Sequence, residues 1–322
     1  DVARKVAEHS GARLIFTTPV LSVSNVYAAE KGSYEIKDAR TLQRPQVQII
    51  DMVHEMKTGN FSLLSRVLQD AIKASPQQNQ RVLLYSSRKA YSGLFLCQNC
   101  GVSVQCPNCD VPMRVHRSSE DMLVCYHCSA YQPLPNQCPN CSSYKLRASG
   151  SPGSQKVKEA VEHFADVPVF ILDSDLIRTP QQERELLDAV HKSPNHILIA
   201  TQMIFSHRYA LDFDTIGIIN TDALESAPDF RAQERLVYQL EKLLDFSPQQ
   251  VLIQTHQPDN PLLHQFRYGD YRLFCAEELS ARKALGYPPF SRLVKLSFRH
   301  RDEQKAATEA RILAERLKMV IA

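Results

Sequence analysis

Four Cys-x-x-Cys pairs between residues 97 and 141 constrain the fold of this chain more than any other feature. Eight of its nine cysteines form them: Cys97/Cys100, Cys106/Cys109, Cys125/Cys128 and Cys138/Cys141. Such a pair can place two thiolates on one tetrahedral ion, and two pairs complete a site. The eight cysteines therefore predict two Zn²⁺ ions. Four thiolates leave no open position for water or substrate, so we expect both sites to be structural.

Spacing favours one assignment of the cysteines to the two ions. The inner pairs are separated by 15 residues, the usual zinc-ribbon spacing, which assigns Cys106, Cys109, Cys125 and Cys128 to zinc 2. The outer pairs, Cys97, Cys100, Cys138 and Cys141, then form zinc 1 in a nested arrangement. An interleaved pairing remains open, and His116 or His127 could replace a thiolate, although the surplus of cysteines argues against it.

Bulk properties exclude several other classes. No secretory pattern opens the chain, so we expect a cytoplasmic protein whose thiols stay reduced rather than forming disulfides. A thioredoxin-like redox motif would explain one cysteine pair, not four. No apolar run reaches the roughly 18 residues that span a membrane. A net charge of +3 does not by itself indicate nucleic acid, and 10 glycines in 322 residues argue against a phosphate-binding loop.

Short apolar runs alternate with amphipathic segments, which predicts an α/β fold with a parallel sheet covered by helices on both faces. The expected strands are 13–16, 47–52, 81–85, 167–172, 196–200, 215–220 and 250–255. The expected helices are 62–74, 155–164, 181–190 and 229–244. The cysteine-rich segment 94–145 interrupts this alternation after the third strand, so it is predicted to be an insertion. A helical stretch at 261–284, a strand at 293–299 and a helix at 302–320 predict a small α+β domain.

The order of motifs resembles that of the PriA family of bacterial replication-restart helicases. The motifs that carry the resemblance are Thr17-Thr18-Pro19 with Leu21-Ser22, Val82-Leu83-Leu84-Tyr85 with Arg88-Lys89-Ala90-Tyr91, the four cysteine pairs, Ala200-Thr201-Gln202-Met203, the run from Pro228 to Arg235, Glu278-Leu279 with Arg282, and Tyr287-Pro288-Pro289-Phe290. The resemblance implies the end of helicase lobe 1 at 1–45, a RecA-like lobe 2 at 46–258 with the zinc insertion at 94–145, and the start of a C-terminal domain at 259–322.

The same resemblance implies a function. Members of that family are ATP-driven 3′-to-5′ DNA helicases that bind stalled forks and load the replicative helicase. Their two zinc ions have the nested pairing. Their zinc module aids duplex separation and contacts single-strand-binding protein and other primosome proteins. Forked or single-stranded DNA and those proteins are therefore the expected partners, and no membrane is expected.

Departures from the family's motor motifs predict that ATP hydrolysis is lost. No G-x-x-x-x-G-K-[ST] loop occurs in the chain. A Gly-Arg-Ala-Gly-Arg element, whose arginines reach the ATP phosphates in the family, is replaced by the run Leu240–Asp245 without glycine or arginine. The family's Lys-Gly loop reads Ser206-His207-Arg208, and its Gly-Thr-Glu reads Gly153-Ser154-Gln155. An arginine finger contributes about 10³–10⁵ in rate to related enzymes. Whether the protein is an enzyme therefore stays open.

Three hypotheses follow for function. The first is a DNA-binding replication-restart protein on a degenerate helicase lobe, with contacts from Arg88, Lys89, Arg114, Arg117, Thr201 and Gln202. Tyr85, Tyr91 and Phe95 could stack bases, although each could equally be core. The second is half of an active helicase completed by an upstream lobe, since Asp1 is not Met. The third is a zinc-stabilised protein-interaction module. His54, His256 and His264 are interpreted as isolated residues rather than ligands.

Overall fold

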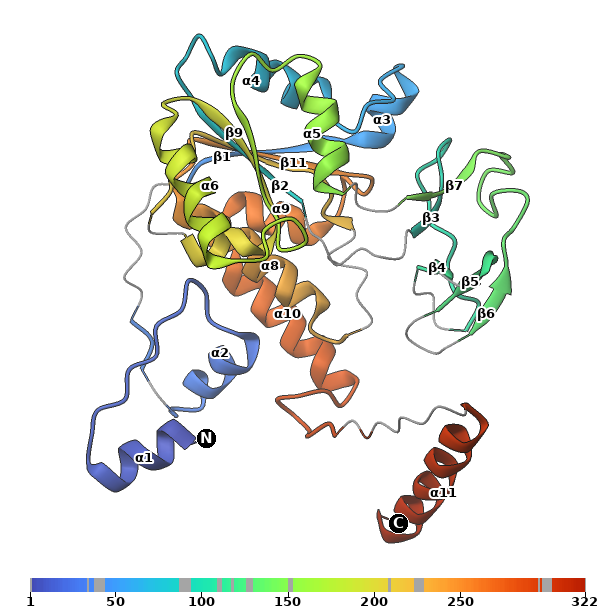
Figure 1. The fold of residues 1–322 in the computed structure, drawn as a ribbon. Helices are drawn as coiled ribbons and strands as arrows, with labels where there is room; N and C mark the ends of the chain where they lie inside the picture. Colours follow the sequence, from blue (N-terminus) through green and yellow to red (C-terminus); the bar gives the residue numbers. More distant parts are fainter. Residues whose placement is uncertain are drawn as a thin grey trace. The chain divides into compact units, whose positions relative to one another are not determined.

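The computed structural model describes residues 2–33, 35–37, 44–86, 94–108, 112–116, 119–125, 130–149, 153–207, 210–222, 229–294, 296 and 303–321. The chain separates into two compact units, Asp1–Ala276 and Glu277–Ala322. The first contains both the large sheet and the cysteine-rich region (Figure 1). The domain limits at 45 and 258 remain predictions.

A six-stranded sheet forms the centre of the first unit, in the order β1-β11-β10-β2-β9-β8. Its strands are β1 (Gln46–Asp51), β2 (Arg81–Tyr85), β8 (Val169–Leu172), β9 (His196–Ala200), β10 (Thr215–Ile218) and β11 (Gln250–Thr255). All five strand pairs are parallel. Every residue of β9 and β10 is buried, as expected for strands covered on both faces. The predicted α/β fold with a parallel sheet is confirmed.

Helices cover both faces of this sheet. On one face, α4 (Arg66–Ala74) and α5 (Ser154–Glu162) contribute Leu68, Ile72, Val157 and Val161 to a core shared with the strands. In Figure 1, α8 (Ala232–Leu243) and α9 (Pro261–Tyr268) lie across the sheet from α4. The other elements of the lobe are α3 (Met52–Lys57), α6 (Pro180–Lys192), η1 (Gln202–His207) and η2 (Leu244–Phe246). The N-terminal segment contains α1 (Val2–Ser10) and α2 (Val23–Glu30).

A second, antiparallel sheet lies between β2 and α5 in the chain, where the sequence predicts an insertion. Its order is β6-β5-β4-β3-β7. The strands are β3 (Leu94–Cys97), β4 (Arg114–His116), β5 (Ser119–Val124), β6 (Tyr131–Pro133) and β7 (Leu146–Ser149). Phe95, Val104, Met113 and Leu123 form its own small core with Cys106 and Cys125. The cysteine-rich region is thus a folded β-module inserted into a RecA-like lobe.

Two predicted strands differ from the structure. Residues 13–16 form no strand, and Ile15 and Phe16 are exposed, because no strand among the described residues pairs with this apolar run. Leu293, Val294 and Leu296 form no strand either, and the other residues of the predicted strand 293–299 lie outside the described part. The helices of this region are α10 (Tyr271–Ala284) and α11 (Glu303–Ile321). None of the described helices combines the length and apolarity needed to cross a membrane.

Candidate metal centre

The structure brings together the four outer cysteines, Cys97, Cys100, Cys138 and Cys141. Their Sγ atoms all lie within 4.8 Å of one another. The shortest separations join the two knuckles: Cys97 to Cys141 and Cys100 to Cys138, each 3.6 Å. Four sulfurs at 2.3 Å from a tetrahedral Zn²⁺ would be about 3.8 Å apart. The geometry and the all-thiol donor set therefore fit a tetrahedral metal ion.

Antiparallel pairing of β3 with β7 positions these thiols. Cys97 ends β3 and lies opposite Leu146 of β7, so the two ends of the insertion are held side by side. Each Cys-x-x-Cys pair then turns back on itself. The N–H of Gly101 donates to the carbonyl of Cys97 at 2.8 Å, and the N–H of Ser142 donates to that of Cys138 at 2.9 Å. Gly101 and Ser142 both have positive φ, which the tight turns require.

Hydrogen bonds to sulfur favour the thiolate form at the exposed side of the cluster. The Asn99 side-chain amide donates to Cys141 Sγ at 3.5 Å. That bond and the Ser143 backbone N–H lower the pKa of Cys141 to about 6. Burial instead raises the pKa of Cys138 to about 11. A bound cation would deprotonate a buried thiol outright, so the mixed surroundings suit four metal-bound thiolates.

The inner cysteines are only partly described. Cys106 and Cys125 are both buried in the core of the antiparallel sheet, and the N–H of Asn108 donates to Cys106 Sγ at 3.4 Å. Cys109 and Cys128 lie outside the described residues. A second metal ion in this module therefore remains a prediction.

The residues predicted to contact DNA fall mainly outside the description. Arg88, Lys89 and Arg117 are not described, and of Arg114 only the backbone, in β4, is described. Thr201 is buried at the end of β9, and Gln202 starts η1 half-buried. Their role as DNA contacts remains a prediction.

Stacking by two of the named aromatics is ruled out by burial. Tyr85 is fully buried and its hydroxyl donates to Gln239 at 2.7 Å, while Phe95 lies in the core of the inserted sheet. Because both are core residues, neither ring offers a face to an unpaired base.

The segment Leu240–Asp245 uses its charges inside the lobe. Glu241 is buried in α8, and its Oε1 lies 2.6 Å from Nη2 of Arg44. The ammonium of Lys242 lies 4.3 Å from the ring centroid of Phe205. At the Gly-Thr-Glu position, the Ser154 hydroxyl donates to buried Asp173 at 2.6 Å. These three groups contact the protein itself.

A buried Asp–His pair was missed by sequence reasoning. His256 is half-buried at the edge of the core, and its Nδ1 lies 2.8 Å from Oδ2 of Asp222, so the residue is paired rather than isolated. Asp222 is 34 residues away and reaches His256 because β10 and β11 are neighbouring parallel strands. His256 lines a cavity of about 600 Å³ together with Asp51, Lys57 and Cys100. Only the spatial pairing of the strands reveals this contact.

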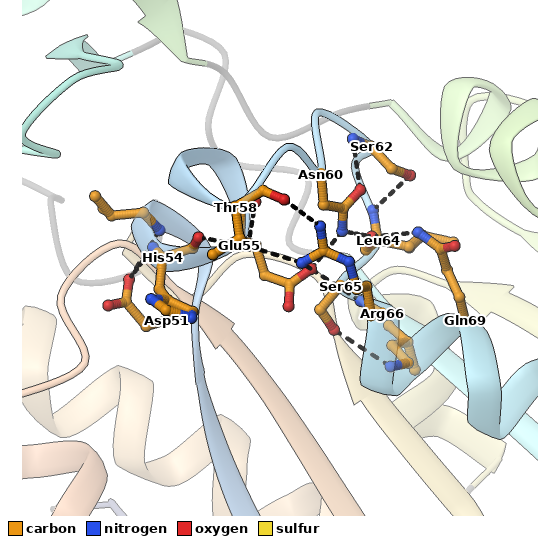
Figure 2. Close-up of polar contacts among 12 residues, drawn as sticks. Asp51, His54, Glu55, Thr58, Asn60, Ser62, Leu64, Ser65, Arg66 and Gln69 are labelled. Carbon is orange, nitrogen blue, oxygen red and sulfur yellow. Dashed lines mark hydrogen bonds and ion pairs between the residues drawn. The ribbon is translucent and has the colours of Figure 1, made fainter.

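Beside that cavity, a polar network fixes the loop between α3 and α4 (Figure 2). Asp51 caps α3 by accepting hydrogen bonds from the N–H groups of Val53 and His54. Glu55 is buried and accepts the N–H of Arg66 at 3.0 Å. The Arg66 guanidinium in turn donates to the hydroxyl and carbonyl of Thr58 at 2.8 and 2.7 Å. The network is satisfied within the lobe, so it has a structural role.

Comparison with known proteins identifies relatives of this chain. No protein-family model matches the chain. It is 33% identical to the replication restart protein PriA of Synechocystis sp. over 285 residues, which are 85% of this chain and 34% of that relative. It is 30% identical to the protein of the same name from Bacillus subtilis over 331 residues, 99% of this chain and 40% of the relative. The Haemophilus influenzae protein of that name is 27% identical over 311 residues, 94% of this chain and 42% of the relative.

The chain thus spans less than half the length of each of these relatives. The similarity nevertheless runs through the parallel sheet and the four-thiol cluster alike. With a cysteine-rich sheet inserted into its α/β lobe, the chain is PriA-like.

Proposed function

We propose that this chain is a zinc- and DNA-binding replication-restart protein whose lobe no longer hydrolyses ATP. The observation that carries the proposal is the cluster of Cys97, Cys100, Cys138 and Cys141 on a sheet inserted into the parallel lobe. Replication restart proteins named PriA are 27–33% identical to this chain, and the alignments cover most of it. The zinc ions, two in number, hold the inserted module folded and take no part in bond-making chemistry.

The loss of hydrolysis is supported by what occupies the motor positions. The resemblance implies that family members carry arginines at the positions matching 240–245, and that those arginines reach the ATP phosphates. Here Glu241 is buried against Arg44, and Lys242 lies over an aromatic ring. A buried carboxylate would repel phosphate rather than stabilise its developing charge.

Partners and location belong to the same proposal. Forked or single-stranded DNA, single-strand-binding protein and primosome proteins are the partners that the relatives' name and the family resemblance suggest, in the cytoplasm. Arg88, Lys89, Arg114, Arg117, Thr201 and Gln202 are the DNA contacts proposed from sequence.

A second candidate is one half of an ATP-driven helicase that works with a further lobe. The observation in its favour is that the chain spans 34–42% of the three relatives. DNA-stimulated ATP hydrolysis after joining the chain to a family lobe that carries a phosphate-binding loop would establish this candidate. A protein-interaction module without DNA contact is the third.

Metal content and a salt titration separate these candidates. The purified chain should contain two equivalents of Zn²⁺ and should bind fluorescent single-stranded and forked DNA at low salt. Binding should weaken steeply as salt rises, because phosphate contacts release counterions. No ATP hydrolysis should accompany it. A chain that holds zinc but binds no DNA at low salt would leave only the interaction module, and a metal-free folded chain would remove the proposal entirely.

A further inference from the structure

An exposed aromatic ring stands on the metal-binding knuckle itself. Tyr144 follows Cys141 by three residues, and 74% of its surface is exposed. The backbone around it is fixed: the N–H of Cys138 donates to Ser143 O at 2.8 Å, and the N–H of Gln98 donates to Lys145 O at 2.8 Å. Gln137 donates a hydrogen bond to the tyrosine hydroxyl. Because this turn is already ordered, stacking of a ligand on the ring would cost little conformational entropy.

Two exposed cations follow the ring closely in the chain. Lys145 and Arg147 are exposed, whereas Leu146 between them packs towards the core of the inserted sheet. Side chains two residues apart on an extended strand point the same way and are about 6.7 Å apart along it. Tyr144 stands in the bend just before β7, so the exposed ring and the two exposed cations form a short solvent-facing row along the chain.

The charge around this row is of a single sign in the sequence. Residues 122–158 contain Lys145, Arg147, Lys156 and Lys158 and no aspartate or glutamate. A net charge of +3 over the whole chain hides this local excess. The row thus lies in a stretch that offers a polyanion no repelling carboxylate.

We propose that Tyr144, Lys145 and Arg147 form a binding site for single-stranded nucleic acid, in which the ring stacks on an unpaired base and the cations contact phosphates. The inference rests on the proposed DNA-binding function and adds a site that none of the sequence-predicted contacts includes. An acidic peptide would also meet the charge. A ring that is 74% exposed lies in no recess, however, and peptide anchors need enclosed pockets, whereas a base needs only a flat face.

Binding of the zinc-loaded full chain to a fluorescent oligothymidine tests the site by anisotropy. Tyr144→Ala should weaken binding about 5- to 150-fold, the usual range for a lost base stack. Tyr144→Phe should bind within about twofold of the parent, because the ring face remains. Replacing both Lys145 and Arg147 by Gln should lower the slope of log affinity against log salt by about 1.4, or about 0.7 for each lost single-strand contact.

Tyr268 supplies a matched control. It is also 74% exposed and has Arg267 beside it, but it ends α9 in the lobe. Tyr268→Ala should bind as the parent does. Each variant's zinc content and urea midpoint are measured first, and the Gln double variant, which changes only exposed side chains, serves if Tyr144→Ala unfolds the knuckle.

The outcomes distinguish this inference from the function on which it rests. A parent chain that binds no oligonucleotide at low salt refutes the proposed function and this site together. A parent that binds, with Tyr144→Ala and the Gln double variant equal to it, refutes only the site. Equal losses in Tyr144→Ala and Tyr268→Ala would also overturn it, as would variants that lose a labelled acidic peptide while keeping the oligonucleotide.

Discussion

The guanidinium of Arg44 lies 2.6 Å from the carboxylate of Glu241, and it joins the segment before β1 to α8. The same guanidinium lies 5.5 Å from the ring centroid of Phe266 in α9. The Glu241 side chain is 3% exposed and the Arg44 side chain 32%. Removing Arg44 therefore affects a buried carboxylate, whereas removing Glu241 affects a guanidinium that water can reach.

Arg44→Ala should lower the free energy of unfolding by about 2 kcal/mol, because it removes the cation that lies 2.6 Å from a buried carboxylate. Glu241→Gln should cost less, about 1 kcal/mol, since the guanidinium, about a third exposed, can still be hydrated. Urea unfolding of both variants measures the difference. Equal costs for the two would show that the pair contributes only through packing.

Cys97→Ser should remove one of two zinc equivalents and release the ends of the inserted sheet. Four thiolates bind the outer ion, and a serine hydroxyl is a poor substitute for a thiolate at neutral pH. Zinc is counted with a colorimetric chelator after thiol modification. Cys275→Ala changes a buried cysteine outside the module and should leave two equivalents. Retention of both ions in Cys97→Ser would contradict the assignment of the outer site.

Gly101→Ala should destabilise the first knuckle for two reasons. Gly101 has φ +76°, and a Cβ there would overlap the side chain of Val53 in α3. Gly32 has φ +75° with nothing within 4 Å of an added Cβ, so Gly32→Ala measures the backbone strain alone, about 1 kcal/mol. The excess loss in Gly101→Ala, read from urea unfolding, reports the contact with Val53. Equal losses would mean that the knuckle does not rest on α3.

His196 should make stability fall as the solution becomes acidic. Burial lowers the pKa of His196, and its Nδ1 lies 3.0 Å from the carbonyl of Ser193. The ring makes edge contacts with Phe170 and Phe213, and the ring centroids are 6.0 Å apart in each pair. Because the unfolded chain binds the proton more readily, this group's contribution is complete above about pH 6.5 and declines below it.

Urea unfolding between pH 5 and pH 7.5 measures this dependence. His196→Gln should flatten the slope below about pH 6.5, relative to the parent, because glutamine does not titrate. An unchanged slope in the variant would assign the acid sensitivity to other groups.

Part of this fold could be predicted from sequence because its strands are buried on both faces. The apolar runs 81–85, 196–200 and 250–255 coincide with β2, β9 and β11. The spacing of the cysteines likewise anticipated which four thiols lie together. Residues 13–16 carry the same kind of apolar run but have no neighbouring strand, and pattern alone cannot supply one.

Tertiary contacts account for what sequence reasoning missed. Tyr85 and Phe95 were candidate stacking residues because sequence does not show which aromatic is covered, whereas Tyr144 was passed over and is exposed. His256 gains its partner Asp222 only when β10 and β11 lie side by side. The burial of a ring and the pairing of His256 both depend on tertiary packing, which the sequence pattern does not show.

The pairing of β3 with β7 closes the inserted sheet at its neck, where the chain leaves the lobe after β2 and returns at α5. Loop-closure entropy grows only slowly with length, by about 0.6 kcal/mol per doubling. Segments beyond the neck can therefore be lengthened, shortened or exchanged with little effect on how the parallel lobe assembles. A module attached in this way is free to acquire new partners while its host keeps its shape.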